Sequence, residues 1–346
     1  MTQNPSVQSL FQPFQGGGLS LSNRIVMAPM TRQFSPEGVP GEDVAAYYRR
    51  RAENQVGLIV TEGTVIDHAD ASNQKNVPHF YGEAALAGWR KVVEDVHAAG
   101  GRIIPQIWHM GARGQVGEYT ESEIEELVRQ FALSAAAAKQ LGFDGIELHG
   151  AHEYLIDQFF WAKTNPRTDR YGGGMVERTR FAVEVIEACR EAVGPDFPIV
   201  FRFSQWKGSD YTAKLAQTPE ELEAFLKPLS AAGVDVFHCS TRRFWQPEFE
   251  GSDLNLAGWT KKLTGKPTIT VGSVGLDGEF LSLFKEGKGA GVSGIDDLLK
   301  RLENGEFDLV AIGRALLADP AWASKVEGGH QDELVAFSPT ALQTLN

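Results

Sequence analysis

The feature that most constrains this chain is the repeated alternation of short apolar runs with longer amphipathic segments. Runs such as Ile25–Ala28 and Leu58–Val60 lack the every-second-residue polarity of a half-exposed strand. Continuous apolar runs of this kind are typical of parallel strands that are buried on both faces. Between them, segments such as Glu121–Leu141 place apolar residues three and four apart, as an amphipathic helix does. The alternation therefore predicts a parallel sheet wrapped by helices.

Eight such strands, with a helical segment after each, predict an α/β protein of the (β/α)8 TIM-barrel class, with residues 1–346 as one domain. The alternative, a doubly wound sheet, would place a Gly-x-Gly-x-x-Gly turn after the first strand. The chain instead has Ala-Pro-Met-Thr-Arg at 28–32. Residues 9–23 are expected to form a short N-terminal hairpin that caps the barrel bottom. The predicted strands are 24–30, 58–64, 102–109, 145–149, 198–204, 234–240, 267–274 and 309–314.

Two helices are expected to begin at capping boxes, in which a threonine and a glutamate three residues later cap each other's backbone. The pairs are Thr120 with Glu123, and Thr218 with Glu221. The second helix also has Pro219 at its first position, where proline fits best.

Composition excludes several classes of partner. The chain has 45 acidic and 33 basic residues, a net charge of −12, which argues against a nucleic-acid or anionic-membrane surface. Its first residues lack the basic and apolar regions of a signal peptide, and it has no apolar stretch of about 18 residues. The two cysteines, Cys189 and Cys239, are too few for a disulfide framework. We expect a cytoplasmic monomer or homodimer whose partners are small molecules.

The ends of the last two predicted strands suggest a phosphate site, because barrels build their active face from the loops that follow the strands. These strands end in Gly272-Ser273 and Gly313-Arg314. Glycines allow close approach of the backbone, and an arginine supplies the charge that an anion requires. Ordinary glycine turns are the alternative, but they do not need Arg314.

A second candidate site follows the fourth predicted strand, where His149, His152 and Tyr154 lie close in sequence. Histidines three apart in a helical turn share one side. Two imidazoles there can donate hydrogen bonds to one carbonyl oxygen, and a nearby phenol can deliver a proton. A metal site lacks a clear third ligand, so no metal is expected. A pair of structural histidines is the other alternative.

Two polar residues fall inside otherwise apolar strands. Arg202 lies in Val-Phe-Arg-Phe-Ser, where a guanidinium needs an anion or an electron-rich ligand. A buried salt bridge with Glu147 or Asp235 is the alternative. Gln106 also needs hydrogen-bond partners, which a flavin ring edge or the neighbouring backbone can supply.

Taken together, these motifs resemble the old yellow enzyme family of flavin oxidoreductases. Each block alone is weak evidence, but seven collinear blocks spanning nearly the whole chain are specific. The matching blocks are residues 23–32, 60–64, 105–111, 149–160, 164–173, 201–204 and 313–320.

The resemblance implies non-covalent FMN at the C-terminal face of the barrel, with NAD(P)H as the reductant. It further implies reduction of the activated C=C bonds of α,β-unsaturated carbonyl or nitro compounds. Reduced flavin N5 would give a hydride to the β-carbon, and Tyr154 would protonate the α-carbon, while His149 and His152 bind the substrate oxygen. The residues implied to hold FMN are Ala28, Pro29, Met30, Thr31, Gly63, Gln106, Arg202, Gly272, Ser273, Gly313 and Arg314.

Two departures from the family pattern bear on activity. Glu153 stands where relatives usually carry glycine. Its carboxylate would favour protonated Tyr154 and His152 if it points inward, and otherwise it faces solvent or stiffens the turn. The loop between His109 and Glu121 is only about ten residues, which should leave the flavin more exposed. The alternative function is therefore a flavin-binding variant with impaired or altered turnover.

Two further alternatives stay open from the sequence. One is an FMN-free lyase or isomerase that uses the phosphate site for its substrate. The other concerns four aromatic residues, which either wall the substrate pocket or pack against the barrel rim. These residues are Trp206, Phe244, Trp245 and Phe249.

Overall fold

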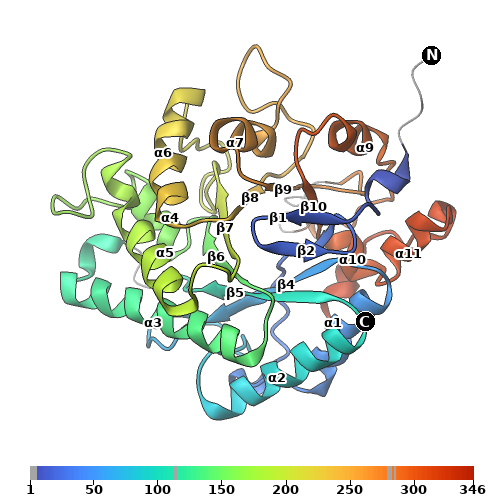
Figure 1. Cartoon of the computed structure of the whole chain (residues 1–346), viewed down its shortest axis with the longest axis horizontal. Coiled ribbons are helices and arrows are strands. Elements are labelled where there is room, and N and C mark those ends of the chain that lie inside the picture. The colour runs from blue at the N-terminus through green and yellow to red at the C-terminus, as the bar shows by residue number, and fades with distance from the viewer. Residues whose placement is uncertain (1–5, 112–114, 279–282, 284–285) are drawn as a thin grey trace.

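The structure, a computed structural model, describes residues 6–111, 115–278, 283 and 286–346. Eight parallel strands close into a barrel in the order β10-β3-β4-β5-β6-β7-β8-β9, which confirms the predicted fold (Figure 1). Val310 of the last strand lies beside Ile25 of the first. The strands are β3 Ile25–Met27, β4 Leu58–Val65, β5 Arg102–Trp108, β6 Ile146–Gly150, β7 Ile199–Ser204, β8 Val236–Ser240, β9 Thr268–Val271 and β10 Leu309–Ile312.

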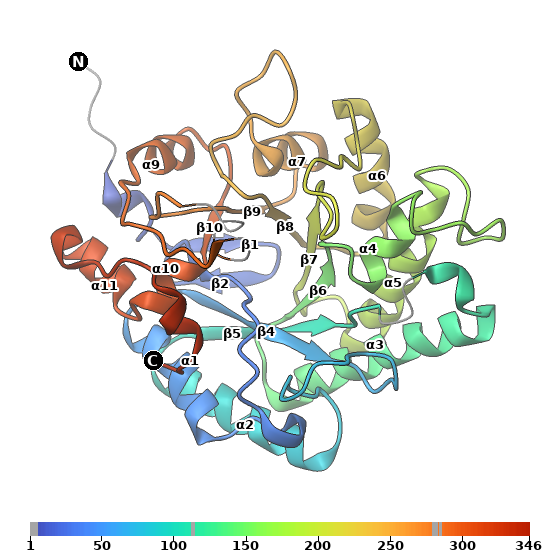
Figure 2. The same ribbon diagram turned by 180° about the vertical axis from the view of Figure 1, so that it is seen from behind.

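A hairpin closes one end of the barrel, as the sequence predicts. Strands β1 (Phe14–Gly16) and β2 (Leu19–Leu21) pair antiparallel. Their apolar side chains are buried together with those that fill the barrel interior, including Val26. The turn reaches the first residue of β8, since a Cβ built on Gly17 would lie 2.5 Å from Val236. Figure 1 views the barrel from the hairpin side and Figure 2 from the opposite side.

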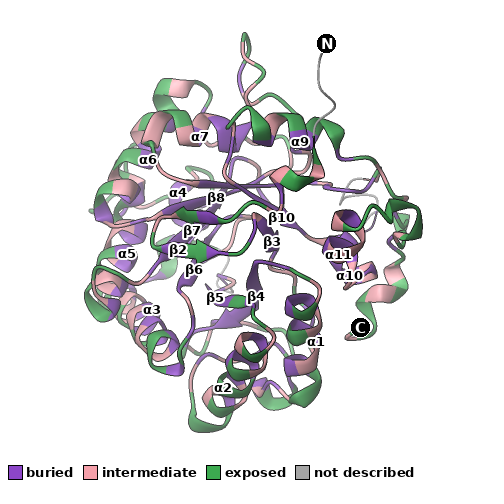
Figure 3. Ribbon diagram, turned by 45° about the vertical axis from the view of Figure 1, so that its right-hand side comes forward, coloured by how far each residue is buried: buried purple, intermediate pink, exposed green. Residues whose placement is uncertain are grey.

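Helices surround the strands and cover the outer face of the barrel (Figure 3). They are α1 Glu42–Glu53, α2 Glu83–Ala98, α3 Glu121–Leu141, α4 Leu155–Phe160, α5 Arg180–Val193, α6 Pro219–Ala232, α7 Leu256–Thr264, α9 Asp296–Glu303, α10 Arg314–Ala318 and α11 Trp322–Glu327. Short 3₁₀ helices span Val7–Ser9, Pro36–Gly38, Val116–Glu118, Glu177–Thr179, Gln331–Glu333 and Pro339–Leu342.

The predicted helix starts are formed, one of them only in part. Thr120 and Glu123 make the complete capping box at α3. At α6 the Thr218 hydroxyl accepts from the backbone N–H of Glu221. The Glu221 carboxylate, however, accepts from Gln217 rather than from Thr218, so only half of that box exists.

The last strands are shorter than predicted because of their glycine-containing ends. β9 stops at Val271, since Gly272 and Ser273 have φ angles of 136° and 50°, outside the range of a strand. β10 likewise stops at Ile312, just before Gly313. The backbone therefore leaves the barrel at the two positions where the sequence predicts a phosphate site.

Within the described ranges, every helix is too short or too polar to cross a bilayer.

Candidate active site

All the residues predicted for the site line one cavity of about 560 Å³ at the carboxyl ends of the barrel strands. Loops that are distant in sequence meet there, because parallel strands all end at the same face of a barrel. The predicted residues in its wall are Ala28, Pro29, Met30, Thr31, Gly63, Gln106, His149, His152, Tyr154, Arg202, Gly272, Ser273, Gly313 and Arg314.

A bulge in β4 brings Gly63 into the cavity wall. The pairing of β4 with β5 shifts register between Val60 and Gly63, after which Gly63 lies opposite Gln106. A Cβ at position 63 would lie 3.0 Å from the Trp108 ring and 3.4 Å from the Gln106 side-chain oxygen. The absence of a side chain at Gly63 therefore keeps free space beside Gln106.

The same bulge directs the Glu62 carboxylate to the segment that follows Thr31. Its Oε2 accepts from the backbone N–H of Arg32 at 2.8 Å and of Gln33 at 3.1 Å. Burial raises the pKa of Glu62 to about 7, although these hydrogen bonds oppose the rise. Glu62 thus fixes the backbone beside Thr31 without lining the cavity itself.

The raised pKa of Glu62 predicts a pH-dependent stability. The Glu62 carboxyl group has a pKa of about 7 in the folded protein, against 4.5 in the unfolded chain. Its contribution to the free energy of unfolding is therefore fully present below pH 4.5 and is lost as the pH rises through 7. The loss corresponds to about 3 kcal/mol. Between pH 5 and 8, the free energy of unfolding should therefore fall by about that much relative to Glu62→Gln, as measured by denaturant titration. Parallel pH profiles for the two proteins would contradict this assignment.

Arg202 enters the cavity wall without the salt bridge considered from sequence. The Glu147 carboxylate is instead bound by Gln106 at 2.8 Å and by His238 at 2.6 Å. Asp235 pairs with Arg190. Arg202 is only 7% exposed, and its Nε has no hydrogen-bond partner among the described residues. A buried cation with a free N–H in a cavity wall suits an electron-rich ligand.

The predicted phosphate residues lie together at the ends of β9 and β10. A Cβ on Gly272 would lie 2.8 Å from the backbone of Arg242 and Arg243, so glycine is required for these two loops to pack. Ser273 Oγ donates to the Arg242 carbonyl at 3.0 Å. Arg314 is the first residue of α10 and lines the cavity. This end of the cavity has the small residues and the cation that a phosphate needs.

The two histidines and the tyrosine meet, but not through the helical turn expected from their spacing. His149 belongs to β6, and His152 follows it with a φ of 63° in a left-handed turn. The two imidazole centroids are 5.2 Å apart, and the Tyr154 ring lies 4.8 Å from His149. A strand end followed by a sharp turn, rather than a helix, therefore brings these three side chains together.

Burial sets the protonation state of this group. It lowers the pKa of His149 and His152 well below the ordinary value, and the nearby Arg202 cation lowers both further. Burial raises the pKa of Tyr154. Both imidazoles are thus neutral and Tyr154 keeps its proton near pH 7. In the part of the chain that the structure describes, no cluster of ligands could hold a metal ion.

The cavity wall also contains Trp206, which the sequence left open between the pocket wall and the barrel rim, and two residues that were not predicted, Trp108 and Ser240. Trp206 stacks on His152 with ring centroids 4.3 Å apart, and Ser240 Oγ is hydrogen-bonded to His152 Nε2 at 2.7 Å. Trp108 packs edge-on against Tyr154 at 5.0 Å. Trp108 and Ser240 end strands β5 and β8, so their positions were a usable signal, whereas that of Trp206 was not.

The other three aromatic residues pack against aromatic side chains outside the cavity wall. Phe244 and Phe249 are buried against Trp245 and Trp259 respectively, at centroid distances of 5.1 and 5.5 Å. None of the three residues considered from sequence, Phe244, Trp245 and Phe249, lines the cavity.

Glu153 points toward the loop after β7, not toward the phenol of Tyr154. Its carboxylate accepts from the backbone N–H of Ser209 at 2.8 Å, and its own N–H donates to Asp157 at 2.7 Å. Neither the pKa shift of Tyr154 nor that of His152 has Glu153 among its causes. The residue has a φ of 68°, a conformation that favours glycine.

This geometry predicts the order of stability of variants at position 153. Glu153→Ala keeps the left-handed strain and loses the hydrogen bond to Ser209, so it should lower the free energy of unfolding by about 1 kcal/mol. Glu153→Gly loses the bond but relieves the strain, and should stay within about 1 kcal/mol of the parent. Denaturant titrations of the three proteins test this order. Alanine more stable than glycine at this position would refute it.

Comparison with known families identifies the family of this chain. The model of the NADH:flavin oxidoreductase / NADH oxidase family matches residues 9–119 and 115–333. The chain belongs to this family. It is the family that the sequence blocks resemble, and its flavin cofactor is FMN, as expected.

Individual relatives of the flavin oxidoreductase family extend the comparison. NADH oxidase of Thermoanaerobacter brockii is 36% identical over 96% of this chain, which spans only 52% of that protein. NADPH dehydrogenase of Bacillus velezensis is 32% identical over 91% of this chain and 93% of its own length. The structure of morphinone reductase in complex with tetrahydroNAD matches with a TM-score of 0.79 at 27% identity, over 96% of this chain and 93% of that one.

The family match consists of two parts that overlap within the loop predicted to be short. Its two parts meet at residues 115–119, between β5 and the start of α3 at Glu121. Part of that loop, residues 112–114, lies outside the described residues.

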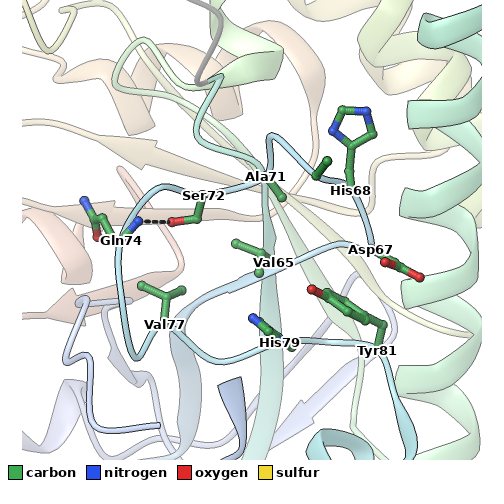
Figure 4. Close-up of a pocket in the computed structure, with 10 residues that line it drawn as sticks. Val65, Asp67, His68, Ala71, Ser72, Gln74, Val77, His79 and Tyr81 are labelled. Atoms are coloured by element: carbon green, nitrogen blue, oxygen red, sulfur yellow. Dashed lines mark hydrogen bonds between the residues drawn. The ribbon is translucent and has the colours of Figure 1, made fainter. Parts of the chain in front are cut away.

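A smaller cavity of about 330 Å³ lies beside the segment that follows β4 (Figure 4). His79 and Tyr81 stack in its wall at 4.7 Å, and Gln74 lines both this cavity and the larger one. No predicted site residue lines it. The larger cavity is therefore the candidate active site.

Proposed function

We propose that the chain is an FMN-dependent NAD(P)H oxidoreductase that reduces the activated C=C bonds of α,β-unsaturated carbonyl or nitro compounds. The observation that carries the proposal is the group of two neutral imidazoles and one phenol in the wall of the cavity that also contains Arg202. Membership of the flavin oxidoreductase family supports the same cofactor and class of reductant.

The residues of the cavity fit FMN. Gly63 leaves space beside Gln106, and Arg202 offers a buried N–H that has no partner among the described residues, as a polar ring edge requires. We infer that Ala28, Pro29, Met30 and Thr31 hold the other side of the ring. Gly272, Ser273, Gly313 and Arg314 would hold the phosphate. When bound, FMN would accept a hydride from NAD(P)H and supply one to the substrate.

His149 and His152 would bind the substrate's carbonyl or nitro oxygen. As neutral imidazoles they can each donate an N–H and polarise the bond as negative charge develops on that oxygen. Ser240 and Trp206 hold His152 by a hydrogen bond and by ring stacking. The orientation of this imidazole is thus fixed before substrate arrives.

Tyr154 would deliver the proton to the α-carbon. Its hydroxyl has no hydrogen bond to any described residue, and its ring is wedged between Trp108 and His149. Because its pKa is raised, the phenol retains a proton that it can donate.

The function is tested by following the two half-reactions without oxygen. The purified protein with FMN should lose its visible flavin absorbance when NADPH or NADH is added. It should regain this absorbance when 2-cyclohexenone follows. Absorbance that stays bleached after the enone would favour the flavin-binding variant with impaired turnover. A protein that binds no FMN would favour the FMN-free lyase or isomerase.

A further inference from the structure

The wall of the cavity carries an unusual charge for this chain. Its described residues include four arginines and no aspartate or glutamate, although the whole protein has a net charge of −12. Two of these arginines, Arg202 and Arg314, are already assigned to the flavin ring and phosphate. A third, Arg32, donates to the carbonyls of Ala341, Leu342 and Thr344. The fourth, Arg242, remains to be explained.

Arg242 lies at the outer end of a row of stacked side chains that begins at the histidine pair. Trp206 stacks on His152, and Tyr211 stacks on Trp206 with centroids 5.3 Å apart and planes 23° from parallel. The Arg242 guanidinium lies 5.6 Å from the Tyr211 ring centroid. The row thus connects the proposed oxygen-binding histidine to a cation in the wall of the cavity.

The position of Arg242 is fixed while its charge is left available. Its backbone carbonyl accepts from Ser273 Oγ at 3.0 Å, which anchors the residue to the end of β9. Among the described residues no carboxylate forms an ion pair with its guanidinium, in contrast to Arg190 and Arg301. A half-buried arginine held on an aromatic ring, whose N–H groups donate to no described residue, suits the bidentate binding of an oxyanion.

We propose that Arg242 forms an oxyanion subsite for the ligand that enters after FMN, binding either a phosphate of NAD(P)H or a carboxylate of the substrate. The proposal rests on the proposed function, since it takes the FMN and histidine sites as assigned. It predicts that the cavity prefers ligands that carry an anion away from their reacting end. Arg242 would be a specificity residue that takes no part in proton or hydride transfer.

The test is equilibrium binding, which does not depend on turnover. The FMN-loaded protein is titrated with the non-reacting nucleotide tetrahydroNAD, with 4-oxo-4-phenyl-2-butenoate and with the methyl ester of that acid. Arg242→Gln should raise the dissociation constant of the nucleotide, of the acid, or of both at least tenfold, because charge-assisted hydrogen bonds are lost. Binding of the neutral ester and of FMN should not change. Arg242→Lys should recover part of the loss.

The control is Arg49→Gln, which removes the same charge from an exposed ion pair with Glu53. It should leave all three dissociation constants unchanged. An effect on the nucleotide alone assigns the subsite to phosphate, and an effect on the acid alone assigns it to a carboxylate. The proposal is overturned if Arg242→Gln weakens acid and ester equally, weakens FMN binding, or changes neither anionic ligand. Failure of the proposed function would appear separately, as an unmodified protein that binds these ligands but is not reoxidised by the enone.

Discussion

Tyr154→Phe should slow reoxidation of the FMN-loaded protein by 2-cyclohexenone by about 10²–10⁴-fold, the usual contribution of a positioned general acid. Reduction by NADPH should stay within about twofold of the parent, because no proton from Tyr154 is needed in that step. The ring of phenylalanine keeps the edge-on packing against Trp108 and His149. The variant therefore removes the hydroxyl while leaving the wall of the cavity in place.

Anaerobic stopped-flow absorbance measures the two half-reactions separately. Tyr81→Phe serves as the matched control, because Tyr81 stacks on His79 in the smaller cavity and lies outside the candidate active site (Figure 4). Both of its half-reactions should match the parent. Equal slowing of reduction and reoxidation in Tyr154→Phe would contradict the role of proton donor and would indicate a structural defect instead.

Lys207→Met should lower the free energy of unfolding by about 3–5 kcal/mol, the range seen when one partner of a buried ion pair is removed. Lys207 and Asp157 form an ion pair in which both side chains have no solvent exposure. Loss of the lysine would leave the Asp157 carboxylate buried and unpaired. Burial already raises the pKa of Asp157 despite its partner, so the penalty should shrink at acidic pH, where the carboxyl group takes up a proton.

Two further variants separate the ion pair from other causes. Lys207→Met combined with Asp157→Leu should recover much of the lost stability, because no buried charge remains. Lys91→Met breaks the exposed pair with Asp95 and should cost less than about 1 kcal/mol. Denaturant titration gives all three values. A loss below about 1 kcal/mol in Lys207→Met would show that the pair does not hold this region together.

The Lys207–Asp157 pair also explains why part of the site was not predictable. It joins α4, which directly follows the turn with His152 and Tyr154, to the loop that carries Trp206, across 50 residues of sequence. The stacking of Trp206 on His152 is a second contact between the same two parts of the chain. No local pattern marks it, so a tryptophan on a loop gave no reason to choose the cavity over the rim.

The fold was predictable because its signal is local and repeated. Each strand is a short apolar run, and the residues at its carboxyl end must meet those of the other strands once the barrel closes. This is why Gln106, His149, Arg202 and Gly313 were found together. The predicted conformation of His152 was wrong. The spacing of His149 and His152 favours a helix, whereas a left-handed residue after a strand brings the two side chains equally close.

The direction of Glu153 and the role of Glu62 depended on backbone geometry that the sequence does not display. The register shift in β4 brings Glu62 to the amides of Arg32 and Gln33. The left-handed φ of Glu153 directs its carboxylate to Ser209. A bulge or a positive φ at a residue other than glycine has no reliable signature in a single sequence.

The central claim is that the cavity at the barrel mouth binds FMN, with the flavin ring near Arg202 and the phosphate near Arg314. A titration of the flavin-free protein with FMN and with riboflavin, which lacks the phosphate, tests it directly by flavin fluorescence. One FMN should bind per chain, and riboflavin should bind at least about a hundredfold more weakly, because the charge-assisted phosphate contacts are absent. Equal affinity for the two flavins, or binding of neither, would contradict the assignment.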